Sequence, residues 1–341
     1  MGLGVGHTTQ SAPTTGPGSR NLTPGADVII LAGRKNPGRP RSEKSIGVQG
    51  MKWLGLTATL GIIVRFWLWR RGIVVSKHWR GLYAVSVWEK RLWRYAIWAA
   101  ERRWARGRSR SELPIGLPRQ QSLLVRRLAG GDLVLQMNKV YNLRLAAARL
   151  DGLLIRPGER FSFWRTVGMP TARRGFKEGL VLVGSRLRPE VGGGLCQLSN
   201  LLYWIFLHSP LTVTERHRHG LDLFPDEERG RPFGTGATVF YNYLDLRARN
   251  DTRLAFQIRV GLTADHLWGE LRCSAEPAHS YRLEERDHAF YRVGGKGFRR
   301  NRVWRLVTDR RNGDEVGAEL VCANDCEVCY PVPDGVSNRE A

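Results

Sequence analysis

The feature that most constrains the fold is the stretch EVGGGLCQLSNLLYWIF, residues 190–206, in which three glycines lead into a cysteine. Glycine permits backbone conformations and close approaches that a side chain would forbid. After the cysteine, apolar residues repeat at the spacing of one helix face: Leu198, Leu201, Leu202 and Ile205. This periodicity predicts a helix. The sequence therefore predicts a tight turn that places Cys196 in the first turn of a helix.

A cysteine in the first turn of a helix is suited to nucleophilic chemistry. The partial positive charge of the helix start favours the thiolate of Cys196 over its thiol. The unpaired backbone N–H groups of such a turn can also stabilise an oxyanion. The alternative interpretation is a small, buried structural cysteine.

A thiol nucleophile usually needs a neighbouring base. His217 and His219, in the segment LTVTERHRHG, are the best candidates, because residues two apart in an extended chain point to the same side. Each could equally be a structural histidine at a strand end. The two histidines and Cys196 could also form part of a zinc site, but no fourth ligand is evident.

The rest of the chain predicts an α+β fold with a mostly antiparallel sheet. Residues 136–152 have helical periodicity, and Gly152 suits the end of a helix. Runs rich in β-formers predict strands at 161–164, 179–184, 211–216, 237–248, 254–262 and 266–273. We expect one domain over residues 135–290 and a β-rich C-terminal extension over 291–341.

The N-terminal part differs in composition. Residues 1–50 are rich in Gly, Pro, Ser and Thr, which predicts disorder, or a natural start at Met51. Residues 51–70 hold the only membrane-like stretch, but Arg65 interrupts it before the roughly 20 apolar residues of a spanning helix. No secretory cleavage site follows. By sequence alone, we expect a cytoplasmic or membrane-peripheral location.

Residues 51–134 predict a basic helical region rich in Trp and Arg. Within it, residues 65–129 contain 16 Lys and Arg against 3 Glu, and eight of the chain's 12 Trp lie between Trp53 and Trp104. Four residues follow one helix face, with arginines off that line: Trp88, Leu92, Tyr95 and Ala99. Residues 51–110 could therefore bind an anionic membrane surface. Alternatively, the Trp face packs on the domain and the arginines are solvated.

The net charge of +23 indicates an anionic partner, or only an arginine-rich proteome. No nucleic-acid-binding module is recognised, so we expect no nucleic-acid partner. We also expect no cofactor. The C-terminal cysteines Cys322, Cys326 and Cys329 have the spacing C-x3-C-x2-C, which makes them weak candidates for a metal site. Ordinary thiols near a strand end are the favoured interpretation.

Several motifs, in one order, carry a resemblance over residues 138–262. They are Pro157-Gly158-Glu159 with Phe161-Ser162-Phe163, the glycines 192–194 with Cys196-Gln197, Tyr203, Glu215-Arg216-His217 with His219, Ala237-Thr238-Val239, Asp245-Leu246 and Asn250. With these motifs the chain resembles the VanW family of bacterial proteins, named after a gene in a vancomycin-resistance cluster.

The resemblance implies a cell-envelope protein that acts on, or recognises, stem peptides of peptidoglycan or its precursors. It implies L,D-transpeptidase-type acyl transfer with Cys196 as nucleophile and His217 or His219 as base. Further residues are expected to bind substrate: Glu159, Gly193, Gly194, Gln197, Tyr203 and Arg216. The alternative is a non-catalytic binding protein, or a membrane-surface accessory protein, linked to glycopeptide resistance.

The chain departs from the family pattern at Gly236, where many members have an Asp before Ala-Thr-Val. If that Asp orients the histidine, another acid such as Asp222 must replace it here.

Overall fold

The computed structural model describes residues 80–125, 133–183, 186–218, 221–222, 231–333 and 336. Our expectations for residues 1–50 and 51–79, and for His219, concern residues outside this part. Helices and mostly antiparallel sheets make up the described chain, which confirms the α+β fold class. Among its helices, none is long and apolar enough to cross a membrane.

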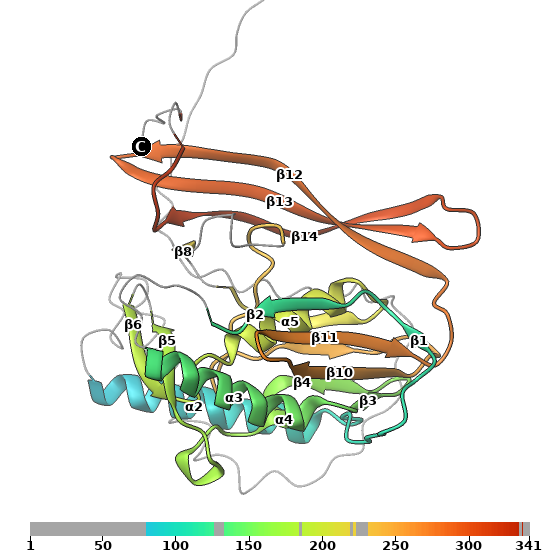
Figure 1. Cartoon of the computed structure of the whole chain (residues 1–341), viewed down its shortest axis with the longest axis horizontal. Coiled ribbons are helices and arrows are strands. Elements are labelled where there is room, and N and C mark those ends of the chain that lie inside the picture. Colours follow the sequence, from blue (N-terminus) through green and yellow to red (C-terminus); the bar gives the residue numbers. More distant parts are fainter. Residues whose placement is uncertain are drawn as a thin grey trace, which may run out of the picture.

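The helices and the main sheets pack together in the lower part of the molecule, which is called the lower layer below (Figure 1). The helices are α2 (Arg80–Ala100), α3 (Leu133–Leu150), α4 (Phe163–Val167), the 3-10 turn η2 (Ala172–Arg174) and α5 (Cys196–Leu207). The largest sheet has the order β1-β11-β10-β3, with β2 also paired to β11. Its strands are β1 (Ile115–Gly116), β2 (Gln120–Leu123), β3 (Leu154–Ile155), β10 (Phe256–Leu262) and β11 (His266–Cys273).

Two small sheets complete this layer. One has the order β4-β9-β7, and the other is the β5-β6 hairpin. Their strands are β4 (Arg160–Ser162), β7 (Thr212–Glu215), β9 (Arg247–Arg249), β5 (Glu178–Val183) and β6 (Arg186–Val191).

A separate sheet, with the order β12-β13-β14-β8, lies above this layer (Figure 1). Its strands are β8 (Leu221–Asp222), β12 (His279–Val293), β13 (Lys296–Asp309) and β14 (Glu315–Val328), and β8 pairs with β14 in parallel. Its long strands begin at His279, so the domain boundary expected at residue 290 falls inside β12.

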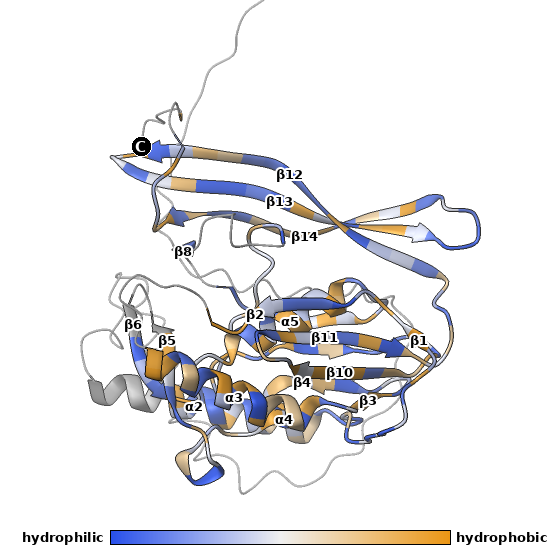
Figure 2. Ribbon diagram, viewed as in Figure 1, coloured by the Kyte–Doolittle hydropathy of each residue, from blue (hydrophilic) through white to orange (hydrophobic). Residues whose placement is uncertain are grey.

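One continuous core holds the lower layer together. The apolar face of α5 is buried, and Gly269 of β11 leaves room for Leu201, whose Cδ2 would lie 2.8 Å from an added Cβ. On α3, the predicted face Leu143, Ala146, Ala147 and Leu150 is buried. Figure 2 shows apolar residues gathered on the helices and strands of this layer, whereas β12 and β13 carry many hydrophilic residues.

Two expected strands are largely wrong. The strand expected at 161–164 ends at Ser162, because its Oγ accepts a hydrogen bond from the backbone N–H of Arg165 and so caps α4. The strand expected at 237–248 is strand only from Arg247 onward. Residues before it are hydrogen-bonded to α5 or form the turn between Phe240 and Leu244, so they make no strand ladder.

Helix α2 also corrects one expectation. Over residues 87–100 of α2, the two buried residues are Arg94 and Trp98, and both lie off the expected Trp88–Leu92–Tyr95 line. Trp88, Leu92 and Tyr95 are instead exposed. The helix therefore turns an arginine face inward, because Arg94 finds a carboxylate partner in Glu215.

Candidate functional site

The glycine turn before Cys196 is as tightly packed as the sequence predicts. Gly192 and Gly194 have φ values of 85° and 92°, which favour glycine. A Cβ on Gly193 would lie 2.0 Å from the carbonyl oxygen of Gly179 in β5. A Cβ on Gly194 would lie 2.0 Å from the Cγ of Lys139 in α3. The turn therefore joins the β5-β6 hairpin and α3 to the start of α5.

Cys196 is the first residue of α5, as predicted. Its Sγ lies 3.6 Å from the carbonyl oxygen of Val239, to which the thiol donates. Burial raises the pKa of the Cys196 thiol. This direction runs against the thiolate that the helix start is expected to favour, because desolvation penalises the charged sulfur.

The backbone N–H groups of the three residues after Cys196 already donate hydrogen bonds within the chain. Gln197 donates to the carbonyl of Gly194, and both Leu198 and Ser199 donate to that of Leu195. These three donors are therefore not free to hold an oxyanion in this conformation.

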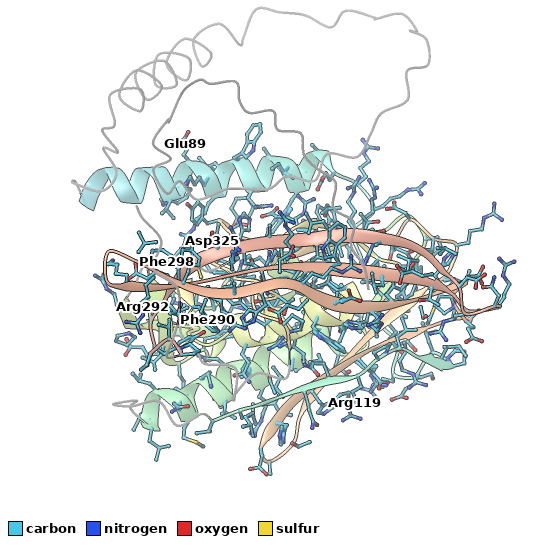
Figure 3. All side chains as sticks on the ribbon, turned by 90° about the horizontal axis from the view of Figure 1, so that it is seen from above. Glu89, Arg119, Phe290, Arg292, Phe298 and Asp325 are labelled. Atoms are coloured by element: carbon cyan, nitrogen blue, oxygen red, sulfur yellow. The ribbon has the colours of Figure 1, made fainter. Side chains whose placement is uncertain are left out.

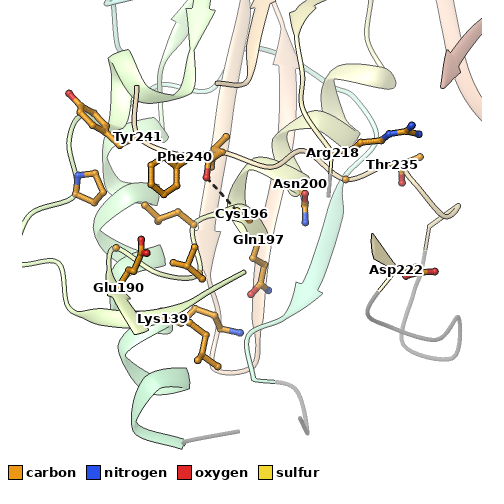
Figure 4. Close-up of a pocket in the computed structure, with 18 of the residues that line it drawn as sticks. Lys139, Glu190, Cys196, Gln197, Asn200, Arg218, Asp222, Thr235, Phe240 and Tyr241 are labelled. Carbon is orange, nitrogen blue, oxygen red and sulfur yellow. Dashed lines mark hydrogen bonds between the residues drawn. The ribbon is translucent and has the colours of Figure 1, made fainter. Parts of the chain in front are cut away.

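Cys196 lines a cavity of about 650 Å³ (Figure 4). On one side of the cysteine the cavity is lined by Lys139 of α3 and Glu190 of β6. Arg218 and Asp222 lie on the other side of Cys196 (Figure 4), and the lining also includes residues of β14 and the segment after it: Asn324, Asp325, Cys326 and Cys329. The cavity thus extends to both sides of the thiol, and the upper sheet forms part of its wall.

The segment 231–241 forms a further wall and is fastened to α5. Ser199 Oγ donates to the carbonyl of Ala237 at 2.6 Å, and the Ala237 N–H donates to Oδ1 of Asn200 at 2.5 Å. Arg231 Nη1 donates to the carbonyl of Asn200 at 3.1 Å. These contacts hold the carbonyl of Val239 over the Cys196 thiol.

Asn200 is a site residue that the sequence reading missed. It lies one helical turn after Cys196, and both line the cavity. Because Oδ1 of Asn200 accepts from Ala237, the amide is oriented with its Nδ2 donor left for a ligand. The i, i+4 spacing from Cys196 was the signal that could have revealed it.

The expected substrate-binding residues divide into two groups. Gly194 and Gln197 line the cavity; Gln197 also donates to Ser122 Oγ and the Leu123 carbonyl. Glu159, Gly193, Tyr203 and Arg216 are outside its lining.

Those four residues have structural contacts. Glu159 accepts from the Arg156 N–H in a turn. Arg216 lies 5.0 Å above the buried Tyr203 ring and donates to the carbonyl of Gly236 at 2.7 Å. Arg216 and Tyr203 therefore support the 231–241 wall from behind.

His217 does not line the Cys196 cavity. Its Nε2 lies 3.0 Å from Oε1 of Glu215. Among the described residues that line the cavity, none is a histidine. Asp222, offered as the acid that could orient the histidine, instead accepts from Tyr330 Oη at 2.7 Å and pairs with Arg299 at 3.5 Å.

Glu215 is the centre of a buried charge network below α2. Arg94 binds both carboxylate oxygens, Arg247 lies 3.7 Å away, and the Asp245 N–H donates to Oε1. Burial opposes the charged form, but the hydrogen bonds from His217 and Arg94 outweigh it and lower the pKa of Glu215 to about 2.

Asp245 has the opposite shift. It is fully buried and accepts from Ser162 Oγ at 2.5 Å and from the Trp164 N–H at 3.1 Å. Burial, followed by the charge of Glu215, raises the pKa of Asp245 to about 6. This network links α2, β7 and the residues before β9 rather than contributing to the cavity.

The C-terminal cysteines do not assemble a metal site. Cys322 and Cys326 are four residues apart on β14, which separates them by about 13 Å along an extended strand. Within the described ranges, no three His, Cys, Asp or Glu residues are grouped to hold a metal. Cys326 and Cys329 line the Cys196 cavity instead.

These features define an α+β protein built around a cysteine at a helix start that faces a large cavity. Residues 138–272 match the family model described as VanW like protein. The chain is 37% identical over 229 residues to the vancomycin B-type resistance protein VanW of Enterococcus faecalis, covering 67% of this chain and 83% of that protein. The chain belongs to the VanW family, which confirms the resemblance.

A second relative is the uncharacterized protein YoaR of Bacillus subtilis, 31% identical over 126 residues, which is 36% of this chain and 39% of that protein. No solved structure matches the chain. Residues of β14 and Arg91 of α2, which help to line the cavity, lie outside the family match.

Proposed function

We propose that this chain is a cell-envelope protein that binds stem peptides of peptidoglycan in the Cys196 cavity and carries out L,D-transpeptidase-type acyl transfer. The observation that carries the proposal is a thiol at the start of α5 in a cavity that extends to both sides of it. A transpeptidase needs this arrangement, since an acyl donor and an amine acceptor must both reach the nucleophile. The name of the enterococcal relative links that protein to vancomycin resistance, which supports a role in the cell envelope here.

The reaction has two balanced steps. In the first, Sγ of Cys196 attacks a peptide carbonyl of the donor stem, the C–N bond breaks, and the thiol proton goes to the departing amine of the terminal residue. In the second, an amine of the acceptor stem attacks the thioester, a new amide forms, and the thiol is regenerated. Asn200 Nδ2 is placed to donate a hydrogen bond to the carbonyl oxygen during both steps.

A protonated resting thiol requires activation by the bound substrate. Displacing the Val239 carbonyl from Sγ would free the S–H, and the departing amine would be the proton acceptor. His217 is not part of the cavity lining, so within the described residues we assign it a structural role rather than that of the base.

Recognition without catalysis is the second candidate function. The half-buried thiol that donates to Val239, with its raised pKa, favours this alternative. In that case the same cavity would hold a stem peptide and Cys196 would serve only to fill space.

The test uses the full chain as wild type, Cys196→Ala and Asn200→Asp, with Cys329→Ala as a matched control because that thiol lines the same cavity. Each protein is incubated with peptidoglycan fragments that carry tetrapeptide stems, and mass spectrometry follows both protein and products. We expect an acyl adduct on Cys196 and new cross-links with wild type and Cys329→Ala, and neither with Cys196→Ala. Asn200→Asp should form the adduct at least about tenfold more slowly, since the donor is lost while the Ala237 contact is kept. Equal fragment binding by all four proteins without adduct or product would leave the recognition function.

A further inference from the structure

The outward face of α2 is unusually apolar for a surface helix. Trp88, Leu92 and Trp93 are 61%, 57% and 70% exposed. Together with Glu89 and Ala96 they line one shallow hollow on the helix. Figure 3 shows Glu89 projecting from the side of α2 that faces away from the sheets. Two exposed tryptophans and a leucine on one face indicate a surface that binds a partner.

The opposite face fixes the orientation of the helix. Arg94 is bound by Glu215, and Trp98 is buried in the core. Two further contacts lie along the helix: Lys90 Nζ donates to Tyr243 Oη at 2.8 Å, and Tyr95 Oη lies 3.0 Å from Tyr241 Oη. Because this face is held by an ion pair and hydrogen bonds, α2 cannot turn its tryptophans into the domain without removing Arg94, which binds both carboxylate oxygens of Glu215.

The residues around this face indicate the kind of partner. Arg102 and Arg103 follow directly after the end of α2, and both are exposed, as is Arg106. Tryptophan rings are favoured at the level of lipid headgroups, and exposed arginines next to them are attracted to anionic lipids. A basic helix that is held on a folded domain with Trp and Leu outward has the composition of an interfacial membrane anchor.

We propose that α2 docks this protein on an anionic lipid surface through Trp88, Leu92 and Trp93, with Arg102 and Arg103 contacting headgroup phosphates. The inference does not depend on acyl transfer. Its consequence for the cavity is geometric: Arg91, on the same helix, lines the cavity, so docking of α2 places a wall of the cavity next to the membrane surface. A ligand that is anchored in the membrane could then reach Cys196 without leaving the membrane.

The test measures co-sedimentation of the full chain with phosphatidylcholine vesicles, with and without phosphatidylglycerol. The double variant Trp88→Ser/Trp93→Ser is compared with wild type and with Val316→Ser/Leu320→Ser. The latter is a matched control that removes two exposed apolar side chains from β14. All substituted residues are exposed, so circular dichroism should be unchanged. The molar mass of wild type and of the tryptophan variant in solution is measured in parallel.

We expect wild type and the β14 control to bind phosphatidylglycerol vesicles equally, and the tryptophan variant to bind at least about tenfold more weakly. Binding to pure phosphatidylcholine should be weaker, and added salt should weaken binding to the anionic vesicles. Unchanged binding of the tryptophan variant would overturn the proposal. Equal binding to both kinds of vesicle would overturn the assignment of an anionic surface. A wild-type dimer that the tryptophan substitutions dissociate would identify a second copy as the partner instead.

Discussion

Replacement of Asp245 by Asn tests the buried charge network directly. The Asp245 carboxylate is fully buried and lies next to the charged Glu215. Asn has nearly the same shape, and its oxygen can still accept from the N–H groups of Trp164 and Leu246, which both donate to Oδ1. Ser162, which donates to Oδ2, can rotate to accept from the new amide. The substitution therefore mainly removes the ionisable carboxyl group and leaves the hydrogen bonds in place.

The expected magnitude follows from the pKa. Folding raises the pKa of Asp245 from 3.8 to about 6, so the folded protein holds this proton more tightly. Below pH 3.8 the group is protonated in both states and has no effect on stability. As pH rises towards 6, the folded state is penalised, and the full penalty above pH 6 is about 3 kcal/mol. Between pH 4 and pH 7, about 2 kcal/mol of it should appear.

The measurement is urea unfolding of wild type and Asp245→Asn at pH 4 and pH 7. The free energy of unfolding of the variant, minus that of wild type, should be more positive at pH 7 by about 2 kcal/mol. Glu215→Gln provides a control of opposite sign. The pKa of Glu215 is lowered from 4.5 to about 2, so its stabilisation is present above pH 4.5 and is lost as pH falls towards 2. Equal differences at both pH values for Asp245→Asn would refute the reasoning.

Three other outcomes are expected. Alkylation of Cys196 by iodoacetamide at pH 8, followed by mass spectrometry, should be slower in the folded protein than in the urea-unfolded chain. The reason is that burial raises the pKa of the Cys196 thiol, and faster alkylation of the folded protein would contradict it. Gly193→Ala should destabilise the protein by at least about 2 kcal/mol in urea unfolding, since its Cβ would meet the Gly179 backbone. Gly317→Ala, with open space around it, should change stability by less than about 0.5 kcal/mol. Arg94→Met should lower the free energy of unfolding by about 3 kcal/mol at pH 7, because Glu215 loses its main partner. An equal loss at pH 2, where Glu215 is half protonated, would show that lost packing and not charge is responsible.

Local sequence determined the start of α5 and the glycine turn before it. Apolar residues at helical spacing specify one buried face, and only glycine tolerates the φ values of Gly192 and Gly194. The strands β10 and β11 were also readable from the sequence, because runs rich in β-formers stand on either side of a short turn. The family motifs also fixed membership, because they occur together in one order.

Tertiary structure decided which face of α2 points inward. The apolar line of that helix is evident in the sequence, but its inward face is set by Glu215, which lies 121 residues after Arg94. A helical periodicity shows that two faces differ, whereas the partner that each face meets depends on contacts between distant parts of the chain. The same holds for His217, whose ring nitrogen lies against the carboxylate of Glu215.

Tertiary structure alone also decided the surroundings of Cys196. Its helix start, taken by itself, favours a thiolate, yet desolvation raises the pKa of the sulfur, which contacts the carbonyl of Val239 in the segment 231–241. Asn200 becomes a site residue only because Ala237 fixes its amide. The sequence thus determined where the thiol stands on its own helix. Its protonation and its neighbours depend on desolvation and hydrogen bonds from segments that only folding brings to it.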